Sequence, residues 1–502
     1  MEPVSRAGTS RKLGLWLGPA LFLLVLALPT PPAMADAALT AGAWERGPQL
    51  ALGMLLWIFI WWVTECVPLG IAALLAPLAF SLSGILPWME SLTAFTHPII
   101  WIFLAGFVLA AAFRKWELDR RLSVMLATLY KGNNPRLAAF FVACLPVFLL
   151  TLTGSITAST AVVFPFLIAY LQIVGVKPGS RFSEGAMLAM AQAATAGALL
   201  FLISTPPNLI AKGTIESFAP GRTLTFLDWL IVGTPMALLG LVISWAVTFW
   251  FIKPEMKTLD VDFSRIARLR ADLGALTRGE KSVLGILGIA MALWILPSIV
   301  RSLAEADPGL LGASDTLSRL MPEAMPAVLV ILAAGILRVR GEPILRWKEL
   351  AEGIDWNVVF LFGGGIALGA GLAASGFATW LAGGVAYSLG SGASPWAIFA
   401  ASALLGFVLS YAASNTAAAL ISTPIAASLA LGAGISPVGP VVAAAIACSI
   451  SSAVPSTTPP MAIVYSSGFV RTWDMFKVGI VSDLIRLGAL LLLGPPLLSL
   501  IT

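Results

Sequence analysis

Two short polar passages stand at corresponding places in an otherwise apolar chain. They are Ser155-Ile156-Thr157 and Ser414-Asn415-Thr416, and each lies between two apolar runs. Some forty to fifty residues later each is followed by a helix-breaking triplet, Thr205-Pro206-Pro207 or Thr458-Pro459-Pro460. A helix broken at bilayer depth leaves backbone N–H and C=O groups free to hold a solute and its coupling ion. A single such passage would be read as a helix cap, but the duplication favours a paired binding site.

The surroundings of the two passages indicate how a charged solute would be held. No Lys or Arg lies within ten residues of Ser155 or Ser414. An anion would therefore depend on hydroxyl or amide donors and on helix N-termini, which carry about half a positive charge and several free N–H groups. The hydroxyl, carboxamide and carbonyl oxygens of the same passages also suit a hard monovalent cation such as sodium.

Composition places these passages in a membrane. Hydrophobic residues make up 59% of the 502 residues and charged residues 11%, whereas a soluble domain carries about 25% charged residues. The apolar runs have the length, roughly 20 residues, at which a helix spans the hydrocarbon core. We therefore predict an all-α polytopic membrane protein with about 11 transmembrane helices. The formal charge of +5 comes from cations in loops between spans, so it does not indicate binding to nucleic acid.

Two apolar stretches, 137–174 and 394–432, are too long for one helix and carry the polar passages in their middle. We predict that each is a re-entrant hairpin with its tip near the midplane. Predicted spans cover 13–31, 49–66, 68–87, 98–113, 184–213, 226–252, 282–300, 323–339, 356–374, 436–468 and 477–500. The sequence is thus divided into a membrane helix (1–35), a first repeat (36–252), a cytoplasmic linker (253–281) and a second repeat (282–502).

The distribution of Lys and Arg predicts the orientation. With the N-terminus in the cytoplasm, most of the 30 cations fall in cytoplasmic segments, as the positive-inside rule requires. The first hairpin then opens to the cytoplasm and the second to the outside, which makes the two halves an inverted repeat. At the N-terminus, the apolar run after Lys12 is read as a first transmembrane helix. The alternative is a signal peptide, because Ala33-Met34-Ala35 resembles a cleavage site.

Several longer motifs extend this interpretation along the chain. They are WWVTECVPLGIAALLAPL (61–78), HPIIWIFLAGFVLAAAFRKWELDRRLS (97–123), STPPN (204–208), SNTAAALISTPIA (414–426) and TTPP (457–460). Through them almost the whole chain resembles the divalent anion:sodium symporter family, which carries dicarboxylates, tricarboxylates or sulfate. The resemblance implies a homodimer in the cell inner (plasma) membrane that moves a small anion, with a C4-dicarboxylate as the leading substrate.

The resemblance also implies roles for residues at the tips and breaks. The substrate-binding residues would be Ser155, Thr157, Thr205, Asn415, Thr416 and Thr458. One sodium ion would bind Thr151, Ser155 and Ser204, and a second would bind Ser410, Ala413, Asn415 and Thr457. Ile156 departs from the family, which has asparagine there. Isoleucine offers no oxygen to sodium and no N–H to a carboxylate, so the second-repeat sodium site is favoured over the first.

The sequence bears on three classes of function: a transporter, a channel and an enzyme. The leading hypothesis is sodium-coupled secondary transport by alternating access. The alternative that Ile156 leaves open is proton-coupled or exchange-type transport of sulfate or of an organic anion. A channel would need a continuous polar pore, which two opposed hairpins do not predict. An enzyme is not expected, because the chain has no HExxH or GxSxG motif. His97, the only histidine, is read as a helix cap, and Glu65 as a partner of a helix end.

Overall fold

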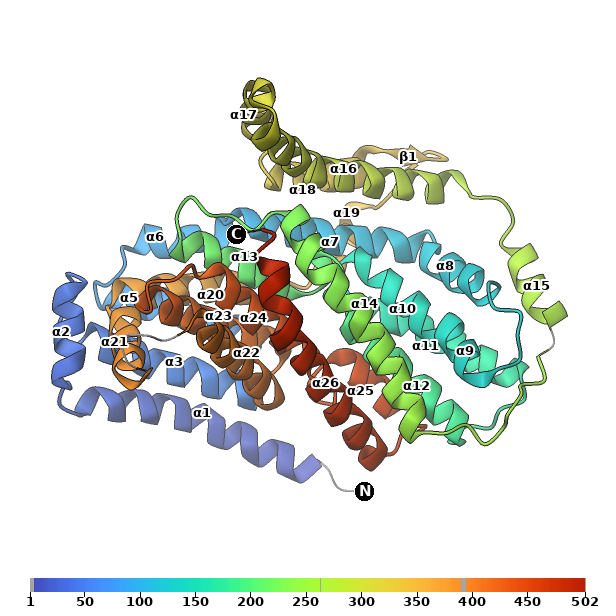
Figure 1. Cartoon of the computed structure of the whole chain (residues 1–502), viewed down its shortest axis with the longest axis horizontal. Helices are drawn as coiled ribbons and strands as arrows, with labels where there is room; N and C mark the ends of the chain where they lie inside the picture. Colours follow the sequence, from blue (N-terminus) through green and yellow to red (C-terminus); the bar gives the residue numbers. More distant parts are fainter. Residues whose placement is uncertain (1–3, 262, 390–393, 502) are drawn as a thin grey trace.

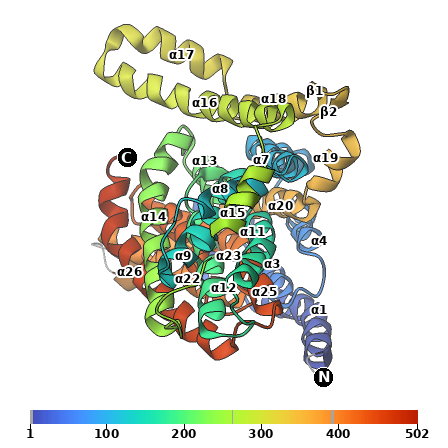
Figure 2. The same cartoon turned by 90° about the vertical axis from the view of Figure 1, so that its right-hand side faces the viewer.

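The computed structural model describes residues 4–261, 263–389 and 394–501 (Figures 1 and 2). Its described residues form helices joined by turns and loops, and one two-stranded hairpin is formed by β1 (Arg338–Val339) and β2 (Glu342–Pro343). Nine helical segments of this part of the chain are long and apolar enough to cross a membrane, or up to 11 if two bent pairs each count as one span. The predicted all-α polytopic membrane fold is therefore confirmed.

The first half begins with α1 (Val4–Ala27) and α2 (Pro32–Thr40), which meet at an angle of 88°. The elements that follow are α3 (Gly47–Thr64), α4 (Leu69–Ala73), α5 (Leu75–Leu82), α6 (Trp88–Thr93), α7 (Pro98–Lys115) and α8 (Leu118–Ala127). The first hairpin comprises α9 (Pro135–Ala139), a π-helical turn (Phe140–Cys144), α10 (Leu145–Leu150), a 3-10 turn (Thr151–Thr153) and α11 (Ile156–Ile173). It is followed by α12 (Arg181–Gly197), a 3-10 turn (Leu202–Ser204), α13 (Pro206–Phe218) and α14 (Phe226–Phe251).

The second half also contains a hairpin followed by a broken span and a long final helix. After α15 (Phe263–Asp272) come α16 (Arg278–Ala306), a 3-10 turn (Pro308–Leu310), α17 (Leu311–Leu320), α18 (Ala324–Ile336), α19 (Trp347–Gly353), α20 (Trp356–Ala374) and α21 (Phe377–Leu389). The second hairpin is α22 (Pro395–Ala412) with α23 (Asn415–Gly432). The final elements are α24 (Val438–Ile450), α25 (Pro459–Ser466) and α26 (Thr472–Leu498).

Both hairpins reverse at the predicted polar passages. In the first, Gly154 adopts φ +92°, and the Ser155 hydroxyl accepts a hydrogen bond from the N–H of Ala158 in the first turn of α11. In the second, the Ser414 hydroxyl accepts from the N–H of Ala417 at the start of α23. The two arms of each hairpin pack against each other. Each stretch therefore turns back on itself, and each serine is the N-cap of the returning helix.

The spans over 184–213 and 436–468 are broken, as the proline pairs predict. The predicted span 68–87 differs, because it is interrupted at Leu74 and ends at Leu82. Pro77 explains the interruption, since proline has no N–H to donate to the carbonyl of Ala73 four residues earlier. A sequence window of mean apolarity does not show this break.

The core of the molecule is made of helices with small side chains. Helix α24 packs against α22 and α23, and α13 packs against α23. Small residues let these backbones approach closely, and a Cβ added to Gly406 of α22 would lie 2.3 Å from the Ala444 carbonyl oxygen of α24. By contrast, α16, α17 and α18 form an arm that stands away from this core (Figure 2). The hairpins and broken spans thus form one packed unit.

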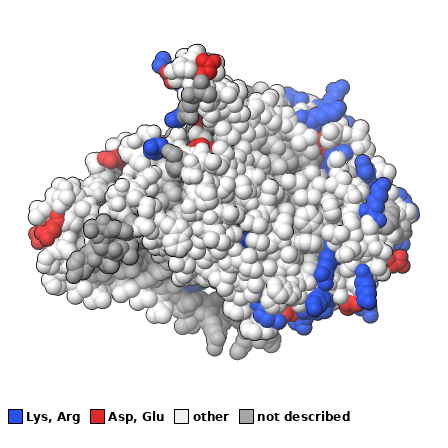
Figure 3. Space-filling model, viewed as in Figure 1, with Lys and Arg blue, Asp and Glu red and all other residues white. Residues whose placement is uncertain are grey.

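Charged side chains are segregated along the long axis of the molecule. In Figure 3, Lys and Arg gather at the right-hand end, where Figure 1 places α8, α15 and the start of α12. The first hairpin enters the core from this end, and α21, which precedes the second hairpin, lies near the opposite end (Figure 1). The two hairpins therefore approach each other from opposite sides.

Candidate solute and cation site

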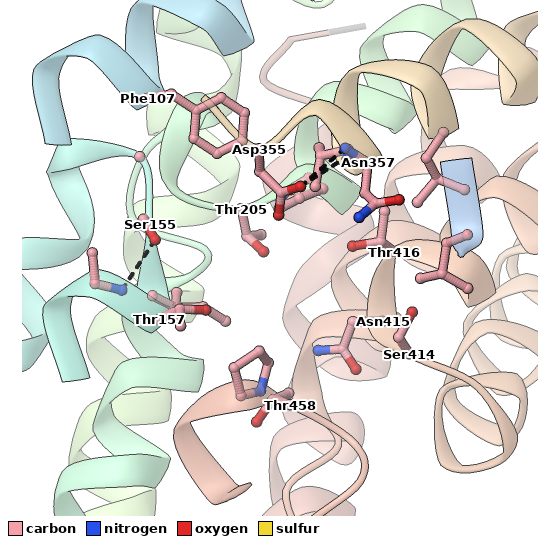
Figure 4. Close-up of a pocket in the computed structure, with 18 of the residues that line it drawn as sticks. Phe107, Ser155, Thr157, Thr205, Asp355, Asn357, Ser414, Asn415, Thr416 and Thr458 are labelled. Atoms are coloured by element: carbon pink, nitrogen blue, oxygen red, sulfur yellow. Dashed lines mark hydrogen bonds between the residues drawn. The ribbon is translucent and has the colours of Figure 1, made fainter. Parts of the chain in front are cut away.

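One cavity of about 1070 Å³ lies where the two hairpin tips face each other (Figure 4). Both tips and both helix breaks line it, together with parts of α7 and the start of α20. Eight of the predicted site residues are at its wall: Ser155, Thr157, Ser204, Thr205, Asn415, Thr416, Thr457 and Thr458. The structure thus brings together residues that are separated by up to 303 positions in the chain.

The tips offer mainly N–H donors to a ligand, whereas the breaks offer mainly oxygens. Helices α11 and α23 each begin at a tip, so the N–H groups of their first residues point toward the cavity end of the helix. Helices α13 and α25 begin with Pro206-Pro207 and Pro459-Pro460, and proline has no N–H. The breaks therefore present mainly carbonyl and hydroxyl oxygens. An anion fits the tips and a cation fits the chain between tip and break.

A cluster of oxygens at the second tip fits a cation. The Asn415 Oδ1 lies 2.7 Å from the Ser410 Oγ and 3.2 Å from the Ser451 Oγ. The Ser410 Oγ also lies 2.7 Å from the Cys448 carbonyl oxygen and 2.5 Å from the Ser451 Oγ. Only the two serine hydroxyls carry protons, so they cannot satisfy all four contacts at once. Two hydroxyls, one carboxamide oxygen and one carbonyl oxygen form a donor set that suits sodium.

Three predicted sodium ligands lie behind the cavity wall. Ser410 belongs to the oxygen cluster just described, and Ala413 is buried between α22 and the tip. Thr151 is buried at the first tip, where its hydroxyl lies 2.7 Å from the Phe148 carbonyl oxygen and 2.8 Å from that of Gly197. The sequence interpretation missed Ser451 and Cys448. A visible signal was available, since Ser449 to Ser452 interrupt the apolar run of α24.

At the first tip the oxygens that converge are the Thr151 hydroxyl and the Phe148 and Gly197 carbonyl oxygens, and among the described residues no carboxamide oxygen contacts Thr151. Ile156 lines the cavity where the second tip has Asn415, and it is 8% exposed. The Ser204 hydroxyl accepts a hydrogen bond from the Phe201 N–H. The two tips are therefore alike in backbone and in their serine caps but differ in the side chains that a cation would contact.

Polar atoms without partners point to a ligand in the same region. Among the described residues, the buried Thr458 Oγ1 and Asn208 Oδ1 have no hydrogen-bond partner, and each lies beside a helix break. Such atoms cost free energy unless a solute, ion or water satisfies them. Thr458 also lines the cavity, so its hydroxyl is available to a bound solute.

Charged residues at the cavity wall were not predicted as part of the site. Asp355 caps α20, where its Oδ1 accepts from the N–H groups of Asn357 and Val358 (Figure 4). Arg114 of α7 and Arg11 of α1 also line the cavity. Glu65, which ends α3 in a left-handed conformation, lines it as well. These charges line the same cavity as the tips, from α1, the end of α3, α7 and the start of α20.

His97 lies outside this cavity lining. Its Nδ1 accepts from the Ile99 N–H at the start of α7, with a distance of 3.4 Å. This is the helix-cap geometry that the sequence predicted for it.

Comparison with known proteins identifies the family. Residues 11–500 match the family described as the sodium:sulfate symporter transmembrane region. The chain belongs to this family. A sodium-dependent dicarboxylate transporter, SdcS, of Staphylococcus saprophyticus is 31% identical over 97% of this chain and 92% of its own length. SdcS of Staphylococcus aureus strain MRSA252 is 30% identical over 95% of this chain and 89% of its own length.

A solved structure supports the fold. MtrF of Neisseria gonorrhoeae, described as one of a class of antimetabolite efflux pumps, aligns with a TM-score of 0.53 and 16% identity, covering 83% of each chain. At this identity the likeness concerns the fold alone. It shows that this chain shares its overall helical fold with MtrF.

Proposed function

We propose that this protein is a secondary active transporter that moves a small dianion, with a C4-dicarboxylate as the leading substrate, in symport with sodium. The supporting observation is the pair of serine-capped tips that face each other across one cavity, with helix N-termini on both sides. Two N-termini separated by a cavity suit a solute with two negative groups. The names of the SdcS relatives support the same substrate class and the same coupling ion.

In this proposal each carboxylate of the solute is held at one tip. Thr157 of the first tip and Thr416 of the second tip supply hydroxyls, and the first N–H groups of α11 and α23 supply the remaining donors. Thr205 and Thr458 add hydroxyls from the breaks. Sodium binds the oxygen cluster of the second tip, where Asn415 joins the cation cluster to the cavity wall. Sodium thereby orders the tip that receives the anion.

Alternating access is part of the same proposal. The two hairpins and two broken spans move as one unit against a scaffold that includes α16 to α18. We also propose that residues 36–252 and 282–502 are the inverted repeats, that 1–35 is a membrane helix and that 253–281 is a cytoplasmic linker. The N-terminus and the Lys- and Arg-rich end are then cytoplasmic, the membrane is the plasma membrane, and two copies form a homodimer.

Transport into proteoliposomes tests the proposal. Uptake of a labelled C4-dicarboxylate should require an inward sodium gradient and should fall to the background of empty liposomes when potassium replaces sodium. The competing mode, proton-coupled or exchange transport, is favoured by Ile156, which removes an oxygen from the first tip. Equal rates in potassium together with a dependence on pH or on internal anion would establish that mode and refute sodium coupling.

A further inference from the structure

A buried acid–base pair on α26 lies directly behind the oxygen cluster of the second tip. Asp483 is fully buried and Arg486 is 2% exposed. Their side chains are 4.0 Å apart, between the Asp483 Oδ1 and the Arg486 Nη1. A buried pair of this kind is costly unless its hydrogen bonds are well made, so the contacts it makes indicate its role.

The contacts of Asp483 reach both segments that build the oxygen cluster. Its Oδ2 accepts from the Tyr411 hydroxyl of α22 at 2.6 Å and from the Ser452 N–H at 2.6 Å, and its Oδ1 accepts from the Ser452 hydroxyl at 2.7 Å. Tyr411 follows Ser410 in the chain, and Ser452 follows Ser451. Ser410 and Ser451 therefore face Asn415. The residues that follow them, Tyr411 and Ser452, face Asp483.

Arg486 holds the other side of the same segment. Its Nη1 donates to the Ile450 carbonyl oxygen at 3.3 Å and to the Thr195 hydroxyl of α12 at 2.9 Å. Ile450 is the last residue of α24. The pair therefore fixes the chain at Ile450 and at Ser452, on either side of Ser451, whose hydroxyl faces Asn415.

We propose that Asp483, together with Arg486, is a positioning group for the cation site of the second tip. The pair carries no net charge, so it acts through geometry: it holds the α24 break and the end of α22 at the spacing at which four oxygens converge. This inference rests on the proposed sodium coupling. Asp483 itself does not contact the cation in this arrangement, because Tyr411 and Ser452 occupy its oxygens.

Sodium-dependent thermal stabilisation of the purified protein tests the inference without any transport assay. A cation that binds only the folded state stabilises it by RT ln(1 + [L]/Kd), so the dependence of the melting temperature on sodium concentration gives an apparent sodium Kd. Asp483→Asn removes the carboxylate that accepts from Tyr411 and Ser452, so we expect the apparent sodium Kd to rise about tenfold or more. Tyr411→Phe and Ser452→Ala each remove one donor and should give smaller rises. They also keep the test decisive if Asp483→Asn does not fold.

Glu280→Gln is the matched control. Glu280 is also a buried carboxylate, paired with Arg121 at 2.5 Å, but it lies at the start of α16, away from the tips. Its substitution should lower the melting temperature without changing the apparent sodium Kd.

Two results would overturn the inference in distinguishable ways. If sodium stabilises the unaltered protein and all three variants with the same apparent Kd, Asp483 has only a structural role and the positioning inference alone is wrong. If sodium does not stabilise even the unaltered protein, sodium coupling is refuted and the inference falls with it.

Discussion

Ser410→Ala should weaken sodium binding selectively, because Ser410 is the centre of the oxygen cluster. Its Oγ lies within 2.7 Å of the Asn415 carboxamide oxygen, the Cys448 carbonyl oxygen and the Ser451 hydroxyl. The substitution removes one of four oxygens that would contact the cation. A hydrogen bond to a charged group contributes about 1.5–3 kcal/mol, and a ligand oxygen of similar strength corresponds to a 10- to 150-fold rise in Kd, on the scale of about 1.4 kcal/mol per tenfold change.

Thermal stabilisation by sodium measures this change. At a free sodium concentration of 100 Kd, stabilisation is about 2.7 kcal/mol, and a tenfold higher Kd lowers it to about 1.4 kcal/mol at the same concentration. Choline chloride at equal ionic strength is the salt control.

Ser402→Ala is the matched variant for this experiment. Ser402 is also on α22 and fully buried, and its hydroxyl has no partner among the described residues. It should bind sodium like the unaltered protein. If Ser410→Ala and Ser402→Ala respond equally to sodium, the oxygen cluster is not the cation site and the reasoning about its donor set is wrong.

Three further predictions concern the first tip and the surface of the molecule. Ile156→Asn should strengthen sodium stabilisation and steepen the sodium dependence of uptake, because it restores a carboxamide at the first tip; an unchanged sodium dependence would contradict this account of that tip. Gly154→Ala should lower stability by about 1–3 kcal/mol, measured by chemical or thermal unfolding, because φ is +92° and a Cβ would lie 3.1 Å from the Cα of Gly106; equal stability would show that the tip relaxes. Burial alone would raise the pKa of Glu349, but the hydrogen bond from Lys115 holds that pKa below its usual value. Glu349→Gln should therefore cost about 0.5 kcal/mol near neutral pH. The difference should shrink as the pH falls below the usual glutamate pKa of about 4.3 and vanish once the pH is below the lowered pKa of the folded protein; a difference that persists at that pH would refute the ion-pair explanation.

Local chemistry made the hairpins predictable from the sequence. Ser155 and Ser414 are N-caps because their short hydroxyl side chains reach the backbone N–H three residues later, and this preference does not depend on tertiary structure. The proline pairs occupy the first positions of α13 and α25 for an equally local reason, since proline has no N–H to donate and its fixed φ suits a helix start. These signals were enough to predict a cavity between two tips, and the structure places eight of the predicted residues at its wall.

Contacts between distant segments were not predictable in the same way. Ser451 is 36 residues from Asn415, and their contact depends on how the broken helix packs against the hairpin. Asp483 is a charge in a predicted span, which alone does not reveal that it holds Tyr411 and Ser452. The bend between α1 and α2 and the interruption at Leu74 also escaped a prediction based on span length. Mean hydropathy registers neither the direction of a helix nor a single missing backbone donor.

The contact between Gly154 and Gly106 has a consequence for how the first hairpin would move. Backbone meets backbone there, with no side chains to interlock, so a sliding tip meets no rotamer that must change and leaves no pocket to refill. At this point a displacement of the tip along α7 would therefore change no side-chain packing. The resistance to each transport step would then arise elsewhere, where charged or bulky groups must part and be rehydrated.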